Sequence, residues 1–452
     1  MGKRTLYGIP AGLYVRDWAG LLVFGAINNY FYVLVNSAAQ SLCTEFHREA
    51  WIGAILWCNI AFGLVARLIN MTITEKFRLR IVVNTLLNVV GLGGIVLSLH
   101  LGTRYFWLCL VAIIFIGTAS SFGESVVLCY LKKFPSELVG AWSSGTGFAG
   151  VLGTLSYAFF KTDALQLRDV NIFTYVSPLL LVYLLLFFVV IKIPEGVQED
   201  EQQQAQQQQD ETKEQTQAHE QLGGESAPLL GGESGINAHP ADTEAVPEHE
   251  TTCERIGRCI RYVWWPSLNL ILVYFFEYVA CMGGSNRAQG GDWRHSPNWF
   301  IRESYVILNL SYQIGVLISR SSLSLVKIKH VEILSIIQLC NMVFWLVQAS
   351  IHFVQGYPLI WVLFLHMVFT GLMGGASYVN VFYLVLHNRT VPPRDRELAT
   401  NIAALSNTFG ITMAAVAILV LEMALWPAND VPLSSSSLFS SSSSSNLSSL
   451  SS

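Results

Sequence analysis

Four ionisable residues lie inside long apolar stretches of the sequence, where charged side chains are rare. They are Glu124 in SSFGESV, Glu277 in FFEYV, Arg67 ahead of EKFRLR, and Arg320 in SRSSL. If these stretches cross a membrane, each charge costs about 2.5–3.5 kcal/mol on insertion scales, which makes each residue a candidate for function. A carboxylate at membrane depth can bind and release a proton, so Glu124 and Glu277 are candidates for proton or substrate contact.

The two arginines suggest an anionic ligand. A guanidinium fork matches two oxygens of a phosphodiester, so Arg67 or Arg320 could bind such a group. Neutral hydrogen-bonding side chains suited to hydroxyl groups occur in the same stretches: Asn28, Asn29, Ser144, Thr146, Tyr378 and Asn380. Two other interpretations stay open. Glu124 and an arginine could form a structural ion pair, and Arg67, near the end of its stretch, could extend to the interface or belong to a gating loop.

The composition shows which solvent these residues are in. Of 452 residues, 52% are hydrophobic and 13% are charged, with a mean hydropathy of +0.45, whereas soluble domains carry about 25% charged residues. We therefore expect an all-α polytopic membrane protein. Apolar runs of about 20 residues predict eleven spans, near 18–42, 51–72, 81–101, 105–129, 137–160, 173–193, 263–283, 304–320, 331–354, 358–386 and 398–426.

One segment is strongly acidic. Residues 195–252 contain 14 Asp or Glu and a single base, Lys213, among many Gln and Gly. Such a segment buries too little apolar surface to offset its ordering entropy, so we expect disorder. The predicted organisation is a six-helix half at 1–193, a disordered acidic cytosolic linker at 194–262, a five-helix half at 263–426 and a Ser-rich tail at 427–452.

The basic residues predict the orientation. With the N-terminus in the cytosol, 19 of the 27 Lys and Arg fall on the cytosolic face and 7 on the other, as the positive-inside rule requires. The linker is then cytosolic and the tail lies on the opposite side. Glycans are added on that opposite side. The sequence has sequons at Asn70, Asn309, Asn388 and Asn446. Only Asn446 lies on that side and outside the predicted spans, so we expect a glycoprotein with its glycan there.

The linker contains ESAPLL, in which Glu225 precedes the leucine pair Leu229 and Leu230. Clathrin adaptors in the cytosol read an acidic residue followed by a leucine pair, so this stretch is a candidate sorting signal. An accidental match is the alternative, because the pattern is short.

The two halves resemble each other. Residues 115–134, FIGTASSFGESVVLCYLKKF, and 369–385, FTGLMGGASYVNVFYLV, each have a Gly two places after a Phe and then a small-residue patch. The spans that follow contain SSGTGFAG (143–150) and SNTFGITM (406–413). These pairs indicate parallel repeats with a site between the halves, although small residues also serve ordinary helix packing.

Several segments closely resemble the battenin family of lysosomal membrane proteins. They are NNYFYVLVNSAAQ (28–40), SSFGESVVL (120–128), WSSGTGFAGVLGTLSY (142–157), YFFEYV (274–279), SRSSL (319–323) and GLMGGASYVN (371–380). Some family members end in a Cys box for prenylation, but the last cysteine here is Cys340 and the sequence closes with NLSSLSS, so we expect no such anchor.

The resemblance implies a fold like that of the major facilitator superfamily and a place in the lysosomal or late-endosomal membrane. It also implies a transporter that exports glycerophosphodiesters and supports lysosomal pH and basic amino acid homeostasis. The alternative is a non-transporting scaffold that organises endolysosomal traffic and autophagy.

Enzyme sites are not apparent. No two of the ten His residues lie three to five positions apart, which excludes HExxH sites and histidine boxes. The eight Cys residues include no CxxC pair, and we interpret most of them as small core residues. We expect no enzyme activity, cofactor, metal or nucleic-acid partner.

Overall fold

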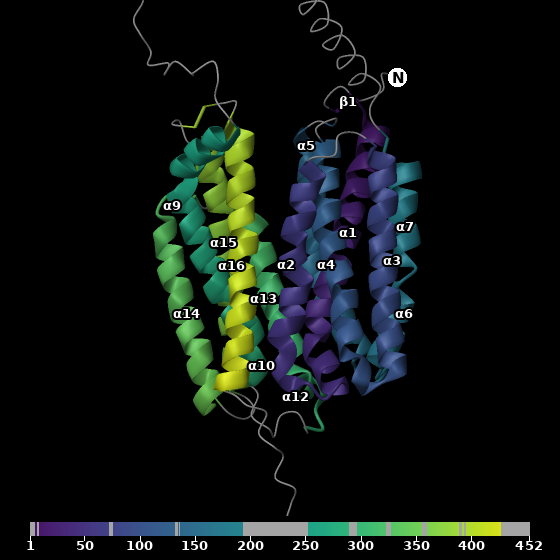
Figure 1. The fold of residues 1–452 in the computed structure, drawn as a ribbon, viewed down its shortest axis with the longest axis vertical. Helices are drawn as coiled ribbons and strands as arrows, with labels where there is room; N and C mark the ends of the chain where they lie inside the picture. The colour runs from purple at the N-terminus through teal and green to yellow at the C-terminus, as the bar shows by residue number, and fades with distance from the viewer. Residues whose placement is uncertain are drawn as a thin grey trace, which may run out of the picture.

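The computed structural model describes residues 5–6, 9–71, 76–131, 134, 136–192, 252–288, 296–321, 327–354, 359–387, 391–392 and 395–425. A short antiparallel hairpin, β1 (Thr5–Leu6) with β2 (Ile9–Pro10), precedes the first long helix. The rest of the described chain is almost entirely helical. Figure 1 shows the helices standing side by side in two bundles, one for each half of the sequence.

The first bundle holds five long helices and a sixth that is broken. The long helices are α1 (Ala11–Glu45), α2 (Ile52–Met71), α3 (Phe77–Leu101), α4 (Phe106–Leu131) and α5 (Ser136–Phe160). The sixth consists of α6 (Asp169–Val176), α7 (Leu179–Leu185) and the π-helix η3 (Leu186–Val190). Single 3₁₀ turns, η1 (Glu49–Trp51) and η2 (Thr103–Tyr105), precede α2 and α4.

The second bundle begins with α9 (Thr252–Tyr278), which continues as the π-helix η4 (Val279–Gly284). The short helices α10 (Ser285–Arg287) and α12 (Trp299–Arg302) follow. The remaining long helices are α13 (Ser304–Ser321), α14 (Val331–Ile351), α15 (Ile360–His387) and α16 (Arg396–Ala424).

All eleven predicted spans coincide with helices of this structure. Among the described residues, nine helices are long and apolar enough to cross a membrane. The other two, α5 and α13, have 25 and 18 residues but more polar sequences, and they pack against each other between the bundles. The polytopic all-α fold class is therefore confirmed.

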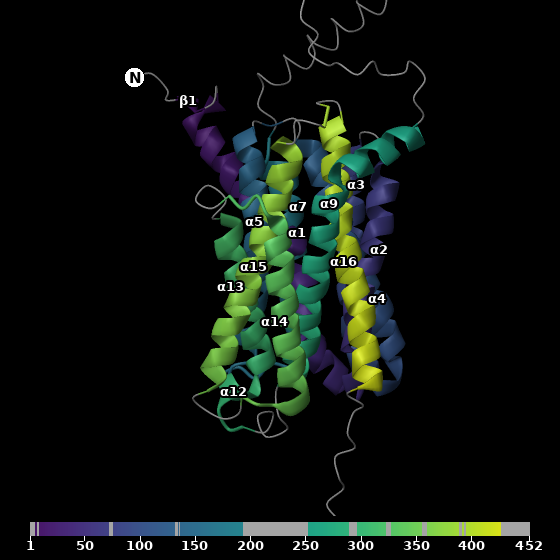
Figure 2. The ribbon, with the colours of Figure 1, turned by 90° about the vertical axis from the view of Figure 1, so that its left-hand side faces the viewer.

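One predicted boundary is wrong. The linker was expected to run to residue 262, but α9 already begins at Thr252. Its first turns carry Arg255, Arg258 and Arg261 and so do not read as an apolar span. Figure 2 shows these turns, in teal, inclined to the other helices. Pro266 lies inside α9, and a proline within a helix typically kinks it.

The outer surface of the bundles is apolar. Large hydrophobic side chains are exposed on several helices, for example Leu365 (70%), Leu181 (65%) and Trp107 (61%). A continuous surface of this kind is unfavourable in water and is the expected lipid-facing surface of a membrane protein.

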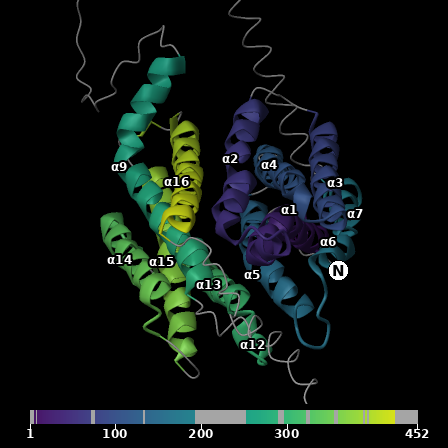
Figure 3. The same ribbon diagram turned by 60° about the horizontal axis from the view of Figure 1, so that its bottom comes forward.

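The two bundles repeat the same pattern of helix packing. In the first, α1 packs on α5, α2 on α4, and α3 on α4; in the second, α9 packs on α16, α13 on α15, and α14 on α15. The bundles meet through α2 with α16 and through α5 with α13, which Figure 3 shows from another side. These are equivalent pairs, so the packing supports the predicted parallel repeat.

Glycine contacts give the register of this repeat. Gly117 of α4 packs directly on the backbone of Asn59 in α2, and Gly371 of α15 packs in the same way on Tyr312 in α13. At both positions an added Cβ would collide with backbone atoms. The predicted similarity of residues 115–134 and 369–385 therefore corresponds to a repeated close contact.

A second pair of contacts relates other helices. Gly145 of α5 packs on the backbone of Leu22 in α1, and Gly410 of α16 packs on that of Ile271 in α9. The motifs SSGTGFAG and SNTFGITM, which contain these glycines, thus serve the same packing purpose in the two halves.

Candidate functional site between the two halves

The repeat register relates the predicted site residues of one half to those of the other. Arg67 lies eight residues after Asn59, and Arg320 lies eight after Tyr312. Counted from the fourth helix of each repeat, Glu124 and Tyr378 each lie seven residues after the packed glycine. The two arginines are therefore equivalent, and Glu124 is equivalent to Tyr378.

In the first half, the arginine is paired with the carboxylate. Arg67 Nη2 donates a hydrogen bond to Glu124 Oε2 at 2.6 Å, joining α2 to α4. The side chains are 21% and 27% exposed, so the pair is only partly buried. Arg67 and Glu124 therefore form the ion pair that one of the sequence interpretations predicted. The pairing neutralises both charges.

In the second half, the arginine lies on aromatic rings. The guanidinium carbon of Arg320 is 4.3 Å from the ring centroid of Tyr378, and its Nη2 donates to Tyr274 Oη at 3.2 Å. Such a cation–π contact contributes roughly 0.5–2 kcal/mol. The Nε of Arg320 is buried without a hydrogen-bond partner.

Tyr378 connects the two halves of the site. It lies within electrostatic range of Arg320 in its own half and of both Arg67 and Glu124 in the other. Four of the predicted residues, from α2, α4, α13 and α15, therefore share one neighbourhood at the boundary between the bundles.

Glu277 of α9 lies behind this group and is more deeply buried. Its side chain is 1% exposed and its Oε2 has no hydrogen-bond partner. The carboxylate faces Gly374 of α15, where an added Cβ would collide with it. Tyr312 hydrogen-bonds to it, and Arg320 acts on it through space.

Asn28 and Asn29 belong to a hydrogen-bond network in the first half. Asn28 Nδ2 donates to Asn29 Oδ1 and to the Ser120 carbonyl, each at 3.0 Å. Ser120 Oγ also donates to Asn29 Oδ1, while Tyr183 Oη donates to Asn28 Oδ1. Asn28 is therefore fully satisfied inside the bundle, and Asn29 is half-buried.

The remaining predicted residues are not brought to the charged group by any contact that we find. Ser144 is exposed on α5, and Thr146 donates to the carbonyl of Ser143 on its own helix. Asn380 accepts a hydrogen bond from the backbone amide of Ile328 at 2.7 Å, anchoring the segment before α14. A ligand role for these three stays a prediction.

One polar cluster was missed by the sequence analysis. Arg80 of α3 is buried and donates to Asn70 Oδ1, and Asn70 Nδ2 donates to Ser125 Oγ at 2.7 Å. Ser125 follows Glu124 directly in the chain, so the cluster lies beside the Arg67–Glu124 pair. Asn70, a sequon residue, is therefore occupied by protein contacts.

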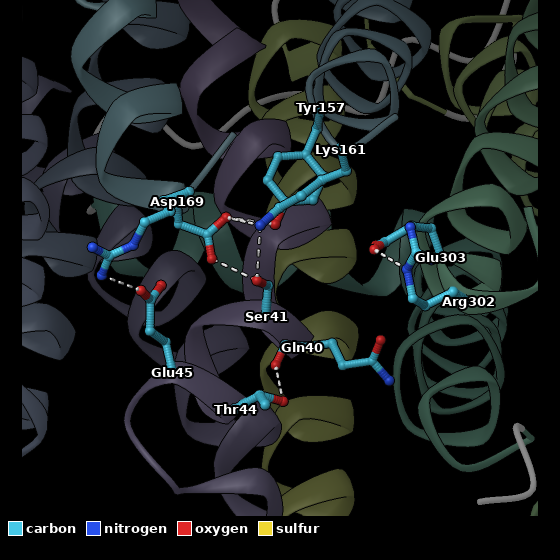
Figure 4. Close-up of polar contacts among 10 residues, drawn as sticks. Gln40, Ser41, Thr44, Glu45, Tyr157, Lys161, Asp169, Arg302 and Glu303 are labelled. Carbon is cyan, nitrogen blue, oxygen red and sulfur yellow. Dashed lines mark hydrogen bonds and ion pairs between the residues drawn. The ribbon is translucent and has the colours of Figure 1, made fainter. Parts of the chain in front are cut away.

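A second missed cluster lies at the end of the bundles opposite the start of α9, which we call the far end. Figure 4 shows Lys161 between Asp169 and Ser41. Lys161 Nζ is 2.8 Å from Asp169 Oδ1, and Asp169 also accepts hydrogen bonds from Tyr157 and Ser41. Lys161 and Asp169 flank a short connection between adjacent helices, which is the one sequence signal that could have paired them.

Contacts at the far end join the two halves. Gln40 Nε2 donates to Asn286 Oδ1 at 2.8 Å, and Arg302 Nη2 donates to Asp163 Oδ1 at 2.6 Å. Glu303, just before α13, has a raised pKa because of burial, although Lys161 and Arg302 act in the opposite direction. Figure 4 shows Arg302 and Glu303 across from the Lys161 group.

Other predictions fall outside the described residues. These are the sorting signal at Glu225, Leu229 and Leu230, the sequons at Asn388 and Asn446, and the Ser-rich tail. Within the parts of the chain that the structure describes, no three His, Cys, Asp or Glu side chains are grouped so as to hold a metal ion.

Comparison with solved structures supports the fold. The chain is similar to a D-xylose–proton symporter, with a TM-score of 0.57 and 13% identity over 91% of this chain and 89% of the other. It is also similar to a bacterial homologue of the human lysosomal transporter Spinster, with a TM-score of 0.53 and 12% identity over 91% and 82%. The fold is therefore that of major-facilitator-type transporters.

Sequence comparison gives the family. Battenin of Dictyostelium discoideum is 47% identical over 94% of this chain and 98% of its own length. Protein btn1 of Schizosaccharomyces pombe is 29% identical over 89% of this chain and 92% of its own length. A sequence model of the family described as CLN3 protein matches residues 19–427. The chain thus belongs to the CLN3, or battenin, family of multi-pass membrane proteins.

Proposed function

We propose that the protein is a solute transporter of the lysosomal and late-endosomal membrane that exports glycerophosphodiesters from phospholipid breakdown. Through that export it supports lysosomal pH and basic amino acid homeostasis. The family and the transporter fold support a small-molecule substrate, while the substrate itself, proton coupling and the location are parts of the proposal.

One observation carries the proposal. Tyr378 lies in electrostatic range of an arginine from its own half and of the Arg67–Glu124 pair from the other. Transporters of this architecture bind their substrates between the halves, at membrane depth. A ligand that contacts this charged group touches both halves at once. Its binding can therefore depend on how the two halves are positioned relative to each other.

The chemistry of the group suits a phosphodiester. Arg320 has a buried Nε without a partner and can offer two N–H groups to two phosphate oxygens. The ring of Tyr378, whose centroid is 4.3 Å from the guanidinium carbon, restricts where the guanidinium can lie. Arg67, which is paired with Glu124 on the other side of the boundary, becomes a second anion ligand when a bound phosphodiester competes with that carboxylate for the guanidinium.

The location follows from the orientation proposed for the chain. The start of α9 and the linker lie on the cytosolic side, and the far end faces the lumen. Clathrin adaptors read the leucine pair at Leu229 and Leu230 and direct the protein to the lysosome.

The deciding experiment uses the full chain in liposomes loaded with radiolabelled glycerophosphoglycerol. We expect release that depends on an imposed pH gradient and is lost in Arg320→Lys, because a lysine keeps the charge but not the fork. A Tyr262→Phe variant on the same bundle is the control. If the wild type moves no glycerophosphodiester with or without a gradient, the scaffold function replaces the transporter.

A further inference from the structure

The repeat register pairs Glu277 with a residue of the first half. Asn28 lies six residues after Leu22, and Glu277 lies six after Ile271, the two backbone positions on which the equivalent glycines pack. The neighbours agree. Asn28 contacts the Ser120 carbonyl, and Glu277 faces Gly374, which is the repeat equivalent of Ser120. Asn28 and Glu277 therefore occupy the same position in the two halves.

The first half shows what this position needs in order to pack. Asn28 is 4% exposed, uses both its amide protons, and accepts from Tyr183 Oη at 3.1 Å. A neutral, hydrogen-bonding side chain is therefore sufficient for the fold. Nothing in the shared packing requires an ionisable group there.

The second half places a carboxylate in that position without the partners that would fix its charge. Glu277 Oε2 is buried and unpartnered, and Tyr312 is a neutral donor. Among the described residues, no Lys or Arg lies within ion-pair distance of Glu277. A buried charge left unpaired is strongly unfavourable, so a side chain that can become neutral is favoured at this site.

Glu124 differs in this respect. Its carboxylate is 2.6 Å from the Arg67 guanidinium and its side chain is 27% exposed. The two intramembrane carboxylates of the site are therefore unequal: Glu124 has an arginine as its counter-charge, and Glu277 has none within ion-pair distance among the described residues.

The surroundings of Glu277 can transmit such a change. Tyr278, the next residue, hydrogen-bonds to Tyr32 of α1 in the other half. The π-helix η4 begins directly afterwards at Val279, and π-bulges within α-helices occur frequently at functional sites. The ionisable groups around Glu277 are Arg320 and Tyr312 on α13, Tyr274 and Tyr278 on α9, and Cys281 on η4.

We propose that Glu277 carries the coupling proton of this transporter, while the Arg67–Glu124 pair serves substrate binding. Protonation neutralises Glu277 beside Gly374 and leaves Arg320 free to hold an anionic ligand. Deprotonation restores the attraction between Glu277 and Arg320 and weakens the hold on the anion. The inference rests on the transport function proposed above.

The transport test compares Glu277→Gln with Glu124→Gln in liposomes, using radiolabelled glycerophosphoglycerol. In Glu277→Gln we expect exchange between inside and outside label to stay within about twofold of wild type, and gradient-driven release to fall at least about tenfold, a typical coupling effect. Glu124→Gln should lose both. If Glu277→Gln keeps full gradient-driven release, the inference is wrong. If the wild type shows neither activity, the proposed function is wrong instead.

A second measurement does not need a substrate. Infrared difference spectra of the wild-type protein between acidic and neutral pH should contain the C=O band of a buried protonated carboxyl group. Part of this band should be lost in Glu277→Gln and retained in both Glu124→Gln and Glu303→Gln, because the buried Glu303 carboxyl can contribute a band of its own. An unchanged band in Glu277→Gln, or no band in the wild type, would overturn the assignment of the proton.

Discussion

Arg67 and Glu124 form an ion pair of 2.6 Å across α2 and α4, and the repeat places Arg320 and Tyr378 in the same relationship across α13 and α15. The first half thus balances its arginine with a carboxylate, and the second balances its own with an aromatic face. The buried carboxylate of the second half, Glu277, is on a third helix, α9, and acts on Arg320 only through space. The two halves therefore differ in how they compensate the charge of equivalent arginines.

The ion pair should matter for stability as well as transport. Glu124→Gln leaves Arg67 without a counter-charge, which we expect to lower stability by about 1–3 kcal/mol, between the values for exposed and fully buried pairs. Thermal unfolding in detergent measures the loss. The double variant Arg67→Gln with Glu124→Gln should recover part of it, and failure of the double variant to recover any would argue against coupling of the two side chains.

The glycine contacts should tolerate no side chain. Gly371→Val places two methyl groups against the Tyr312 backbone, and we expect destabilisation of about 1–3 kcal/mol. Size-exclusion profiles and melting temperatures report this effect. Gly93→Ala on α3, where nothing lies within 4 Å of an added Cβ, is the control. Equal melting temperatures for the two variants would contradict the register.

Glu303 should make the far end sensitive to pH. Burial raises its pKa, with Lys161 and Arg302 acting against the shift. For an acid whose pKa is raised by folding, the contribution to stability is complete below the ordinary pKa of about 4.3. That contribution is lost as the pH rises through the pKa of the folded protein. Glu303→Gln removes this loss. Its melting temperature should exceed that of the wild type at neutral pH, and the difference should disappear near the ordinary pKa.

The control for that substitution is Glu45→Gln. Glu45 is the last residue of α1 and also lies at the far end. A pH-independent difference between Glu303→Gln and the wild type would show that packing, and not ionisation, causes the effect.

The sorting signal can be tested apart from transport. Leu229→Ala with Leu230→Ala should shift the protein towards the plasma membrane, because adaptors bind both leucines, while release from liposomes stays unchanged. Fluorescence microscopy and surface biotinylation measure the shift. Normal lysosomal arrival would mean that the pair is incidental or that another signal suffices.

The helices were predictable because an apolar run of about 20 residues is a strong signal. The start of α9 was not, since Arg255 and Arg258 interrupt the apolar pattern. In the structure both pair with Asp395, the residue before α16. That contact spans 140 positions of sequence, so no local pattern could indicate it.

The site was predictable as a set of residue types and not as an arrangement. Intramembrane charge pointed to Arg67, Glu124, Glu277 and Arg320, because charge is costly in lipid. Which carboxylate is paired depends on the helix register, which the glycine contacts set. Neutral contacts such as Gln40 with Asn286 gave no signal, because amides are common in membrane helices that pack together.

Gly374 illustrates a genetic consequence of the packing around Glu277. Because its missing side chain is what leaves room for that carboxylate, even an alanine at position 374 should displace the acid. An apolar substitution there should therefore reproduce the phenotype of a charge mutation at position 277. Inherited variants at the two positions should therefore have the same effect, although 97 residues separate the positions in the chain.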